Sequence, residues 1–537
     1  MDRVRQTEKE TSYSVMPRVV VTQSDSSGDD KLERILFELE DYQISHGSLL
    51  KIPRALTDLE SAVAVAHPIG VSVVPTRFPR LHFEHAQDIQ PFFNELYMSV
   101  SEDYDWLESI IRPLGEVDEH VGKLWSIWER VREKGEVQPL RCGIFRSDYM
   151  LHYNQKSTEG QHGIYTDPSD QVDRSVLDSE LKQVEFNTYS CAGGTHANIV
   201  ANMHRYLIHK GVHETASLPA NSSLMSIVEA LAVAHQAYGP PISQTCQAAI
   251  LMTVQPNNVN ICDERPIEYA LLERKPPIML FRVCFGGAVL QKCRLGPNRE
   301  LLFQLTPETV PIEISVVYQR AGYDSHEYDQ KGIDARLLLE ISRAIKCPTI
   351  LSHMAGFKKV QQALTRPGVL ERFLSSEKAV GTLRHTFMPQ FPMDPPEDGD
   401  GDGIMIEKIT RDRKEATNYV LKPSLEGGGH NIYGADIPDF LDTVPREARS
   451  KYILMEKIHP IPMHGVLVSP ESTFQGPVVS ELGVLGTCLW RRKGGSGERP
   501  QILESSGAGW TFKTKSKHVE EMSVVKGYGC FDCPSLF

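Results

Sequence analysis

The sequence has no run of apolar residues long enough to cross a membrane, and it has no excess of positive charge. A membrane-spanning helix needs about 20 consecutive apolar residues, so no segment is expected to cross a bilayer. Acidic residues outnumber basic ones by 70 to 57, which gives a net charge of −13. Because binding to a phosphate backbone needs a basic surface, we expect neither nucleic acid nor a membrane as a partner.

Cysteine is also scarce, with 10 residues scattered over 537. A disulfide-held secreted domain concentrates its cysteines in a short chain, and a chain of this length can bury a large core without them. The opening residues, MDRVRQTEKETSYS, lack the apolar segment of a secretory signal. Cys530 and Cys533 have CxxC spacing without a second pair, so we expect no zinc or redox site there. These features favour a large cytoplasmic protein, most readily an enzyme.

Apolar spacing and turn residues predict several helices. Residues 1–30 are polar and rich in serine and aspartate, which predicts a disordered tail. Apolar residues recur at helical spacing from 32 to 47, and residues 80–132 have a mostly helical pattern. Residues 226–238 form an amphipathic helix pattern that stops at a Gly-Pro-Pro sequence, and residues 388–403 predict a solvated loop rich in proline, glycine and aspartate.

Short apolar segments predict strands in the rest of the chain. Between about 248 and 318 they include a hairpin with arms at 288–295 and 300–305, followed by a helix at 335–345, which together predict a compact α/β unit. The remaining predicted strands are 143–153, 183–188, 418–423, 451–458 and 478–490.

One segment combines a strand, a lysine and three successive glycines. The strand ends near Lys422, and Glu426 stands directly before Gly427, Gly428 and Gly429. Glycines let N–H groups approach a phosphate closely, a lysine adds a point charge, and a glutamate can hold the accompanying Mg²⁺. The spacing fits neither a Walker loop nor a Rossmann fingerprint. The segment therefore either covers nucleotide phosphates or is an ordinary glycine-rich hairpin turn, and its composition fits both.

Two other strands carry polar residues at informative positions. Glu185 and Asn187 are two apart, so they face the same side and offer oxygen ligands to a hard cation such as Mg²⁺. The apolar strand around Met455 changes to Glu456 and Lys457, as at the edge of an adenine slot. Each pattern also has a commoner explanation, which is a solvated strand face for the first and a strand end that reaches solvent for the second.

The order of these motifs is more specific than any one of them. It resembles the eukaryotic glutathione synthetase family from about Gly143 to Lys515, through QVEFNTYS, VVYQRAGY, AIKCPTILSHMAGFKKVQQAL, YVLKPSLEGGGHNIYG, YILMEKI and SELGVLG. The resemblance implies an α+β chain with an ATP-grasp fold, an inserted α/β substrate-binding domain and a helical N-terminal region. It also implies a homodimer that joins γ-glutamylcysteine to glycine with ATP and Mg²⁺. We place the boundaries at residues 1–30 (tail), 31–250 (N-terminal helical and ATP-grasp part), 251–365 (inserted domain) and 366–537 (C-terminal ATP-grasp part).

The resemblance assigns roles position by position. Arg146 is the expected catalytic residue, and the expected Mg²⁺ ligands are Glu185, Asn187 and Glu426. The expected ATP-binding residues are Lys358, Lys422, Gly427, Gly428, Gly429, Asn431, Tyr433, Met455, Glu456, Lys457, Ile458, Glu481 and Lys515, of which Glu481 would hold the ribose. The donor and acceptor substrates would be bound by Arg146, Ser190, Asn260, Glu264, Arg320, Tyr323, Lys513, Val524 and Val525.

Departures from the family pattern concentrate on the peptide side. The segment 190–194 is one residue shorter than the family's Ser-x-Ser-Phe-x-Gly and lacks its second serine. Asn258 stands where the family has a glutamate, and Glu264 where it has a glutamine. Lys513 replaces an arginine, which removes a two-pronged contact to a carboxylate. The second lid, residues 518–529, is bulkier and more charged than the family's alanine- and glycine-rich segment.

The implied reaction transfers the γ-phosphoryl group of ATP to a carboxylate, and an amine then displaces phosphate from the acyl phosphate. Three functions fit the sequence. The first is glutathione synthetase, the second a ligase of the same family with another donor or acceptor, and the third a non-catalytic relative that binds nucleotide or peptide. The third is disfavoured because the expected metal ligands and phosphate-binding lysines are all present in the sequence.

Overall fold

The structure is a computed structural model, and it describes residues 26–52, 65–153, 176–243, 247–394, 401–424, 430–470 and 472–537. Helices surround a 13-stranded sheet and three smaller sheets, so the predicted α+β class is confirmed. Within the described residues, no helix is both long enough and apolar enough to cross a membrane.

Four long antiparallel strands form the centre of the large sheet. The strand β18 (Ser472–Arg491) pairs with β19 (Gln501–Ser516) on one side and with β5 (Leu140–His152) on the other, and β5 also pairs with β6 (Glu180–Asn187). These strands confirm the predictions at 143–153, 183–188 and 478–490. Neighbouring residues on paired strands share a face of the sheet, so these pairings decide which polar side chains meet.

The predicted α/β unit continues this sheet. The short strand β12 (Ile345–Cys347) pairs in parallel with β5 and with β11 (Ile312–Gln319), which in turn pairs with β7 (Ala248–Val254). β8 (Leu280–Cys284) extends the sheet beyond β7. The division of the chain into domains stays a prediction, but the strands of residues 251–365 share the sheet of their neighbours.

One arm of the predicted hairpin is wrong. Residues 288–292 lie in the helix α9 (Gly287–Lys292), and only β9 (Cys293–Leu295) and β10 (Leu301–Phe303) form the antiparallel pair. A short apolar run fits a helix or a strand equally well. Here Gly286 has φ of +84°, a left-handed conformation that glycine adopts without strain, and the helix starts directly after it.

Most predicted helices are confirmed. Residues 80–132 form α2 (Arg80–Glu102), α3 (Tyr104–Val117) and α4 (Glu119–Lys134), and residues 226–238 lie in α7 (Ser223–Tyr238). The first helix, α1 (Ser26–His46), begins inside the predicted tail, whose residues 1–25 lie outside the described part of the chain.

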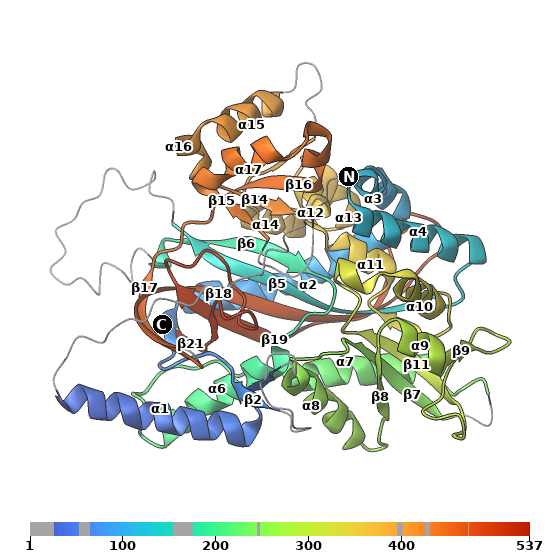
Figure 1. The fold of residues 1–537 in the computed structure, drawn as a ribbon, viewed down its shortest axis with the longest axis horizontal. Coiled ribbons are helices and arrows are strands. Elements are labelled where there is room, and N and C mark those ends of the chain that lie inside the picture. Colours follow the sequence, from blue (N-terminus) through green and yellow to red (C-terminus); the bar gives the residue numbers. More distant parts are fainter. Residues whose placement is uncertain are drawn as a thin grey trace, which may run out of the picture.

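A separate four-stranded sheet stands at the top of Figure 1, above the long strands. It contains β14 (Tyr419–Pro423), β15 (Ile432–Tyr433) and β16 (Tyr452–Glu456), and α15 (Gly401–Arg411) packs beside it. Its edge strand, β13 (Gln390–Pro392), lies in the predicted loop 388–403. That loop prediction is wrong at both ends, because Phe391 pairs with Leu454 of β16 and α15 begins at Gly401, while residues 395–400 lie outside the described chain.

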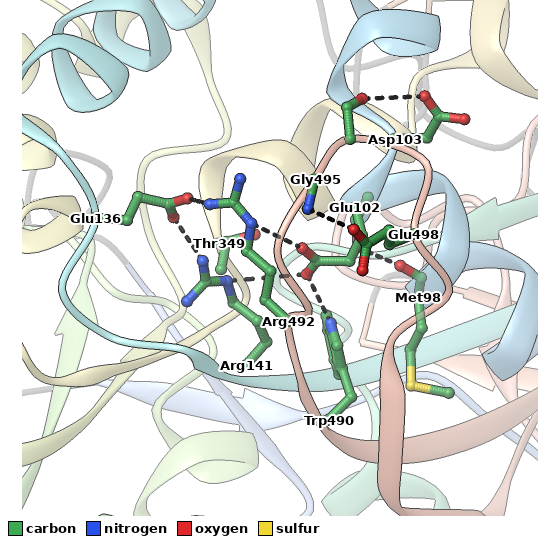
Figure 2. Close-up of polar contacts among 12 residues, drawn as sticks. Met98, Glu102, Asp103, Glu136, Arg141, Thr349, Trp490, Arg492, Gly495 and Glu498 are labelled. Carbon is green, nitrogen blue, oxygen red and sulfur yellow. Dashed lines mark hydrogen bonds and ion pairs between the residues drawn. The ribbon is translucent and has the colours of Figure 1, made fainter.

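A buried ionic cluster fastens α2 to β5 and β18 (Figure 2). Glu102, the last residue of α2, accepts a hydrogen bond from Trp490 Nε1 at 2.8 Å and lies beside Arg141 and Arg492. Glu136 forms ion pairs with both arginines. Burial raises the pKa of Glu102, and the arginines and the indole N–H oppose that rise. The cluster therefore fixes the ends of two strands that carry polar residues of the candidate site.

Candidate active site

A cavity of about 1390 Å³ is lined by strands of both the large and the four-stranded sheet. Every residue predicted to bind ATP, Mg²⁺ or the peptide substrates lines it, except Lys358 and four residues that lie outside the described chain. Lys358 is not part of the lining, although its Nζ lies 3.3 Å from Glu185 Oε2. Glu426 and Gly427–Gly429 lie outside the described residues. The fold thus brings together side chains that are up to 379 positions apart in the sequence, from Arg146 to Val525.

The predicted metal ligands meet two lysines. Glu185 and Asn187 of β6 point to one face of the sheet, and Asn187 Nδ2 donates to Glu185 Oε1 at 3.2 Å. Burial would raise the pKa of Glu185, but Lys358, Lys422 and Arg146 outweigh it and lower that pKa to about 2. Glu185 is therefore ionised at neutral pH, and it offers a carboxylate to a cation.

Lys422 lies deep in the wall of the cavity. Its side chain is 5% exposed and donates to the Val184 carbonyl at 2.8 Å. Burial and the charge of Lys358 lower the pKa of Lys422 to about 8, while Glu185 opposes that shift. Lys515 of β19 donates to the carbonyls of Val519 and Glu520, both at 2.6 Å, so it holds the start of the second lid.

Arg146 and an unpredicted residue, Asp148, form a two-pronged ion pair on β5. Arg146 Nε and Nη2 donate to the two carboxylate oxygens of Asp148, each at 2.7 Å, and Nη1 donates to the Ala192 carbonyl at 3.0 Å. Burial would lower the pKa of Arg146, and Asp148 raises it, so the guanidinium stays charged. The two-residue spacing that drew attention to Glu185 and Asn187 is also present here, and it was the signal that could have identified Asp148.

Cross-strand pairing places Lys513 opposite Glu481. Their Nζ and Oε1 atoms are 2.5 Å apart, and both side chains are mostly buried. Burial, with Asp148 and Glu185 nearby, raises the pKa of Glu481, and Lys513 opposes that rise. The ammonium group of Lys513 is therefore paired with Glu481.

The predicted adenine strand and the flank of the glycine-rich lid also meet. Met455, Glu456, Lys457 and Ile458 line the cavity together with Asn431 and Tyr433, and Lys457 Nζ lies 5.6 Å above the Tyr433 ring. The N–H groups of Glu456 and Lys457 donate to Pro389 and Asn418 within the protein. A purine at this strand would therefore use other backbone groups than these two.

On the peptide side, Asp263 holds the predicted residue Arg320 and the start of α6 (Gly194–His209) in place. Its carboxylate accepts hydrogen bonds from Gly193 N and Thr195 N, at the start of α6, and from Arg320 Nη2 at 3.0 Å. Arg320 and the fully buried Asp263 therefore form a fixed pair. Ser190 has a left-handed φ of +48°, a conformation that costs energy for a residue other than glycine. Asp263 was missed because its contacts join segments about 70 positions apart.

The exchanged residues on this side contact one another. Asn258 Nδ2 donates to Glu264, whose carboxylate also accepts from Arg282 Nη2 at 3.1 Å. Asn260 and Tyr323 line the same part of the cavity. An amide and a carboxylate therefore face each other here, with the amide at position 258 and the carboxylate at position 264.

The second lid reaches the nucleotide half of the cavity. Val524 and Val525 line the cavity as predicted, but the acidic residues before them make the polar contacts. Glu520 forms an ion pair with Lys457 at 2.9 Å, and Glu521 Oε1 accepts from Asn431 N at 3.3 Å. The charge that distinguishes this lid is therefore placed beside the predicted ATP residues.

Comparison with known proteins agrees with this geometry. The sequence model described as "Eukaryotic glutathione synthase, ATP binding domain" matches residues 29–536. The chain belongs to the eukaryotic glutathione synthase family. The glutathione synthetase large chain of Schizosaccharomyces pombe is 31% identical over 521 residues, which cover 93% of this chain and 96% of that protein. Human glutathione synthetase is 31% identical over 509 residues, which cover 94% of this chain and 97% of the human protein.

A solved structure has the same fold as this synthase-family chain. It is a glutathione synthetase-like effector from Globodera pallida in its apo form, with a TM-score of 0.68 and 20% sequence identity. The match covers 96% of this chain and 98% of the effector. At that identity the likeness concerns the fold alone.

Proposed function

We propose that this protein is an ATP- and Mg²⁺-dependent ligase that joins γ-glutamylcysteine to glycine through an acyl phosphate. The observation that carries the proposal is that most of the expected nucleotide, metal and peptide residues line one cavity in a member of this family. The two sheets that line the cavity support an ATP-grasp arrangement, in which a nucleotide lies between two α+β parts. Residues 251–365 would then supply the peptide side.

The donor set suits Mg²⁺. Glu185 is ionised, Asn187 adds an amide oxygen, and hard oxygen ligands are those that Mg²⁺ prefers. Within the described residues, no group of three or more His, Cys, Asp and Glu side chains could hold a metal, so the proposed site also needs Glu426. When bound there, Mg²⁺ would neutralise charge on the phosphates of ATP.

The residues of the chain have distinct roles in the proposed reaction. Lys358, Lys422 and Lys515 bind phosphate oxygens, and Arg146 stabilises negative charge on the γ-phosphoryl group as it moves to the donor carboxylate. The acceptor amine then attacks the acyl carbon, and phosphate leaves. Because an acyl phosphate hydrolyses readily, water has to be excluded from the cavity, and residues 519–526 of the second lid border it. No covalent attachment to the enzyme is required.

A second candidate is a ligase of the same type that prefers another small amine. Lys513 forms an ion pair with Glu481, and the second lid is acidic and bulky. The ion pair engages the ammonium group that would bind an acceptor carboxylate, and Val524 and Val525 of the lid line the cavity where the resemblance expects the substrates. We also infer a cytoplasmic homodimer that acts on small molecules, as the family resemblance implies.

Phosphate release tests the proposal. Purified protein with ATP, Mg²⁺ and γ-glutamylcysteine should release phosphate in step with peptide formation only when glycine is added. Release that requires another amine selects the second candidate. No release with any donor and acceptor would overturn both and leave a non-catalytic binding role.

A further inference from the structure

We propose that Asp148 is a positioning residue for this reaction, which orients Arg146 and Asn187 without touching substrate. The inference rests on the proposed function. Asp148 lies on β5, its side chain is 1% exposed, and it is not among the described residues that line the cavity. Its carboxylate nevertheless contacts two residues that do.

The first contact fixes a guanidinium group. Because Nε and Nη2 of Arg146 bind separate oxygens of Asp148, the plane of the guanidinium cannot rotate without breaking both bonds. The third nitrogen, Nη1, is held by the Ala192 carbonyl. The guanidinium of Arg146 is therefore held in one orientation at the cavity. It needs to move little when negative charge develops there.

The second contact fixes an amide. Asn187 Nδ2 donates to Asp148 Oδ2 at 3.0 Å and to Glu185 Oε1 at 3.2 Å. Both acceptors engage the nitrogen, so the oxygen is the amide atom that remains for a cation. An asparagine at 148 could fill the space, but its single oxygen cannot replace both oxygens that Arg146 Nε and Nη2 bind, and its NH₂ group would face a donor.

The surroundings accommodate this third carboxylate at a cost. Asp148 is directly opposite Glu185 in the β5–β6 pairing, and it helps to raise the pKa of Glu481. Like charges this close destabilise one another, and the charge of Arg146 offsets that cost. The room comes from Gly483 of β18, where a Cβ would lie 2.6 Å from Asp148 Oδ1.

The test compares the single variants Asp148→Asn and Arg146→Ala with the double variant. Asp148→Asn keeps the shape and should lower kcat about 100-fold, because a misplacement of about 1 Å costs that much, while KM for ATP changes less than about threefold. In the Arg146→Ala background, Asp148→Asn should cost less than about 10-fold, because the part that acts through Arg146 is already lost and only the part that acts through Asn187 remains. Asp148→Glu keeps the charge and displaces it, and it should also lose kcat.

Asp103→Asn is the matched control. Asp103 is another buried aspartate paired with an arginine, Arg372, at 2.5 Å, and it lies away from the cavity. Its replacement should lower the melting temperature and leave kcat unchanged. Should Asp148→Asn fail to fold, Asp148→Glu carries the same double-variant test.

Two results would overturn the inference: wild-type kcat in Asp148→Asn, or full additivity with Arg146→Ala. If the wild-type protein releases no phosphate under any condition, the proposed function fails separately. The crystal structure of Asp148→Asn then decides. Movement of the Arg146 guanidinium away from the Ala192 carbonyl supports a positioning role, and an unmoved Arg146 and Asn187 contradict it.

Discussion

At Lys513 a single ammonium group stands where the family places an arginine, and Glu481 already binds that group. A lysine recognises a carboxylate as a point charge, whereas arginine binds it with two parallel hydrogen bonds. We expect Lys513→Arg to raise kcat/KM for glycine about 10-fold, which corresponds to about 1.4 kcal/mol. Glycine, alanine, β-alanine and serine at equal concentration, with product masses counted, measure this. Strong wild-type preference for glycine with no gain in the variant would show that the lysine is tolerated.

Gly483 allows the Arg146–Asp148 pair to lie against β18. An added Cβ would collide with Thr511 Oγ1 and with Asp148. Gly483→Ala should therefore lower the free energy of unfolding by about 1–3 kcal/mol and reduce kcat at least 10-fold. Gly507→Ala on β19 is the control, because a Cβ there meets no atom within 4 Å. Equal behaviour of the two variants in thermal melts and turnover would refute the close approach.

At the scale of elements, the second lid places a carboxylate near the lysines that are predicted to bind phosphate. Glu521 accepts from Asn431 N and acts electrostatically on Lys422 and Lys515. Because this charge opposes binding of an anion, Glu521→Gln should tighten ATP binding about 3- to 10-fold. Titration calorimetry measures this, and Glu504→Gln, an exposed acid outside the cavity, controls for net charge. An equal gain in both variants would assign the effect to overall charge. Unchanged ATP binding in both variants would show that the charge of Glu521 does not weaken ATP binding.

Asp532, which lies close to the C-terminus, links three strands from distant parts of the chain. Its carboxylate accepts hydrogen bonds from the hydroxyls of Ser72, Thr76 and Thr514, which come from β3 (Val71–Ser72), β4 (Thr76–Phe78) and β19. Asp532→Ala would leave these buried donors unsatisfied, so we expect a loss of about 3 kcal/mol in the free energy of unfolding. The exposed Asp439→Ala should change it by less than about 0.5 kcal/mol. Chemical denaturation of both variants checks the difference.

The elements also show what sequence reasoning can recover. Long helices and strands such as α2, β5 and β18 were predictable because their apolar spacing persists over many residues. The helix α9 was not predictable, because its six residues are too few to distinguish the helical period from the strand period. The small strand β13 was hidden in a proline-rich segment, because its partner β16 is more than 60 positions away.

For the molecule as a whole, the cavity was predictable from family motifs and its supporting contacts were not. The resemblance named a large part of the cavity lining, from Arg146 to Val525. Asp148 and Asp263 do not line the cavity. The two-residue spacing could have singled out Asp148, but its contact with Asn187 depends on the β5–β6 pairing, and the contacts of Asp263 depend on the approach of α6. Sequence motifs thus identify residues that line the cavity more readily than residues that hold the lining residues in place.

The central claim is that a donor carboxylate is activated by ATP in this cavity, and oxygen transfer tests it most directly. γ-Glutamylcysteine labelled with ¹⁸O in the cysteinyl carboxylate is incubated with protein, ATP, Mg²⁺ and glycine, and the released phosphate is analysed by mass. An acyl phosphate leaves one carboxylate oxygen on the phosphate, so we predict one ¹⁸O per peptide bond formed. Phosphate without ¹⁸O, or no peptide product with any amine, would contradict the account.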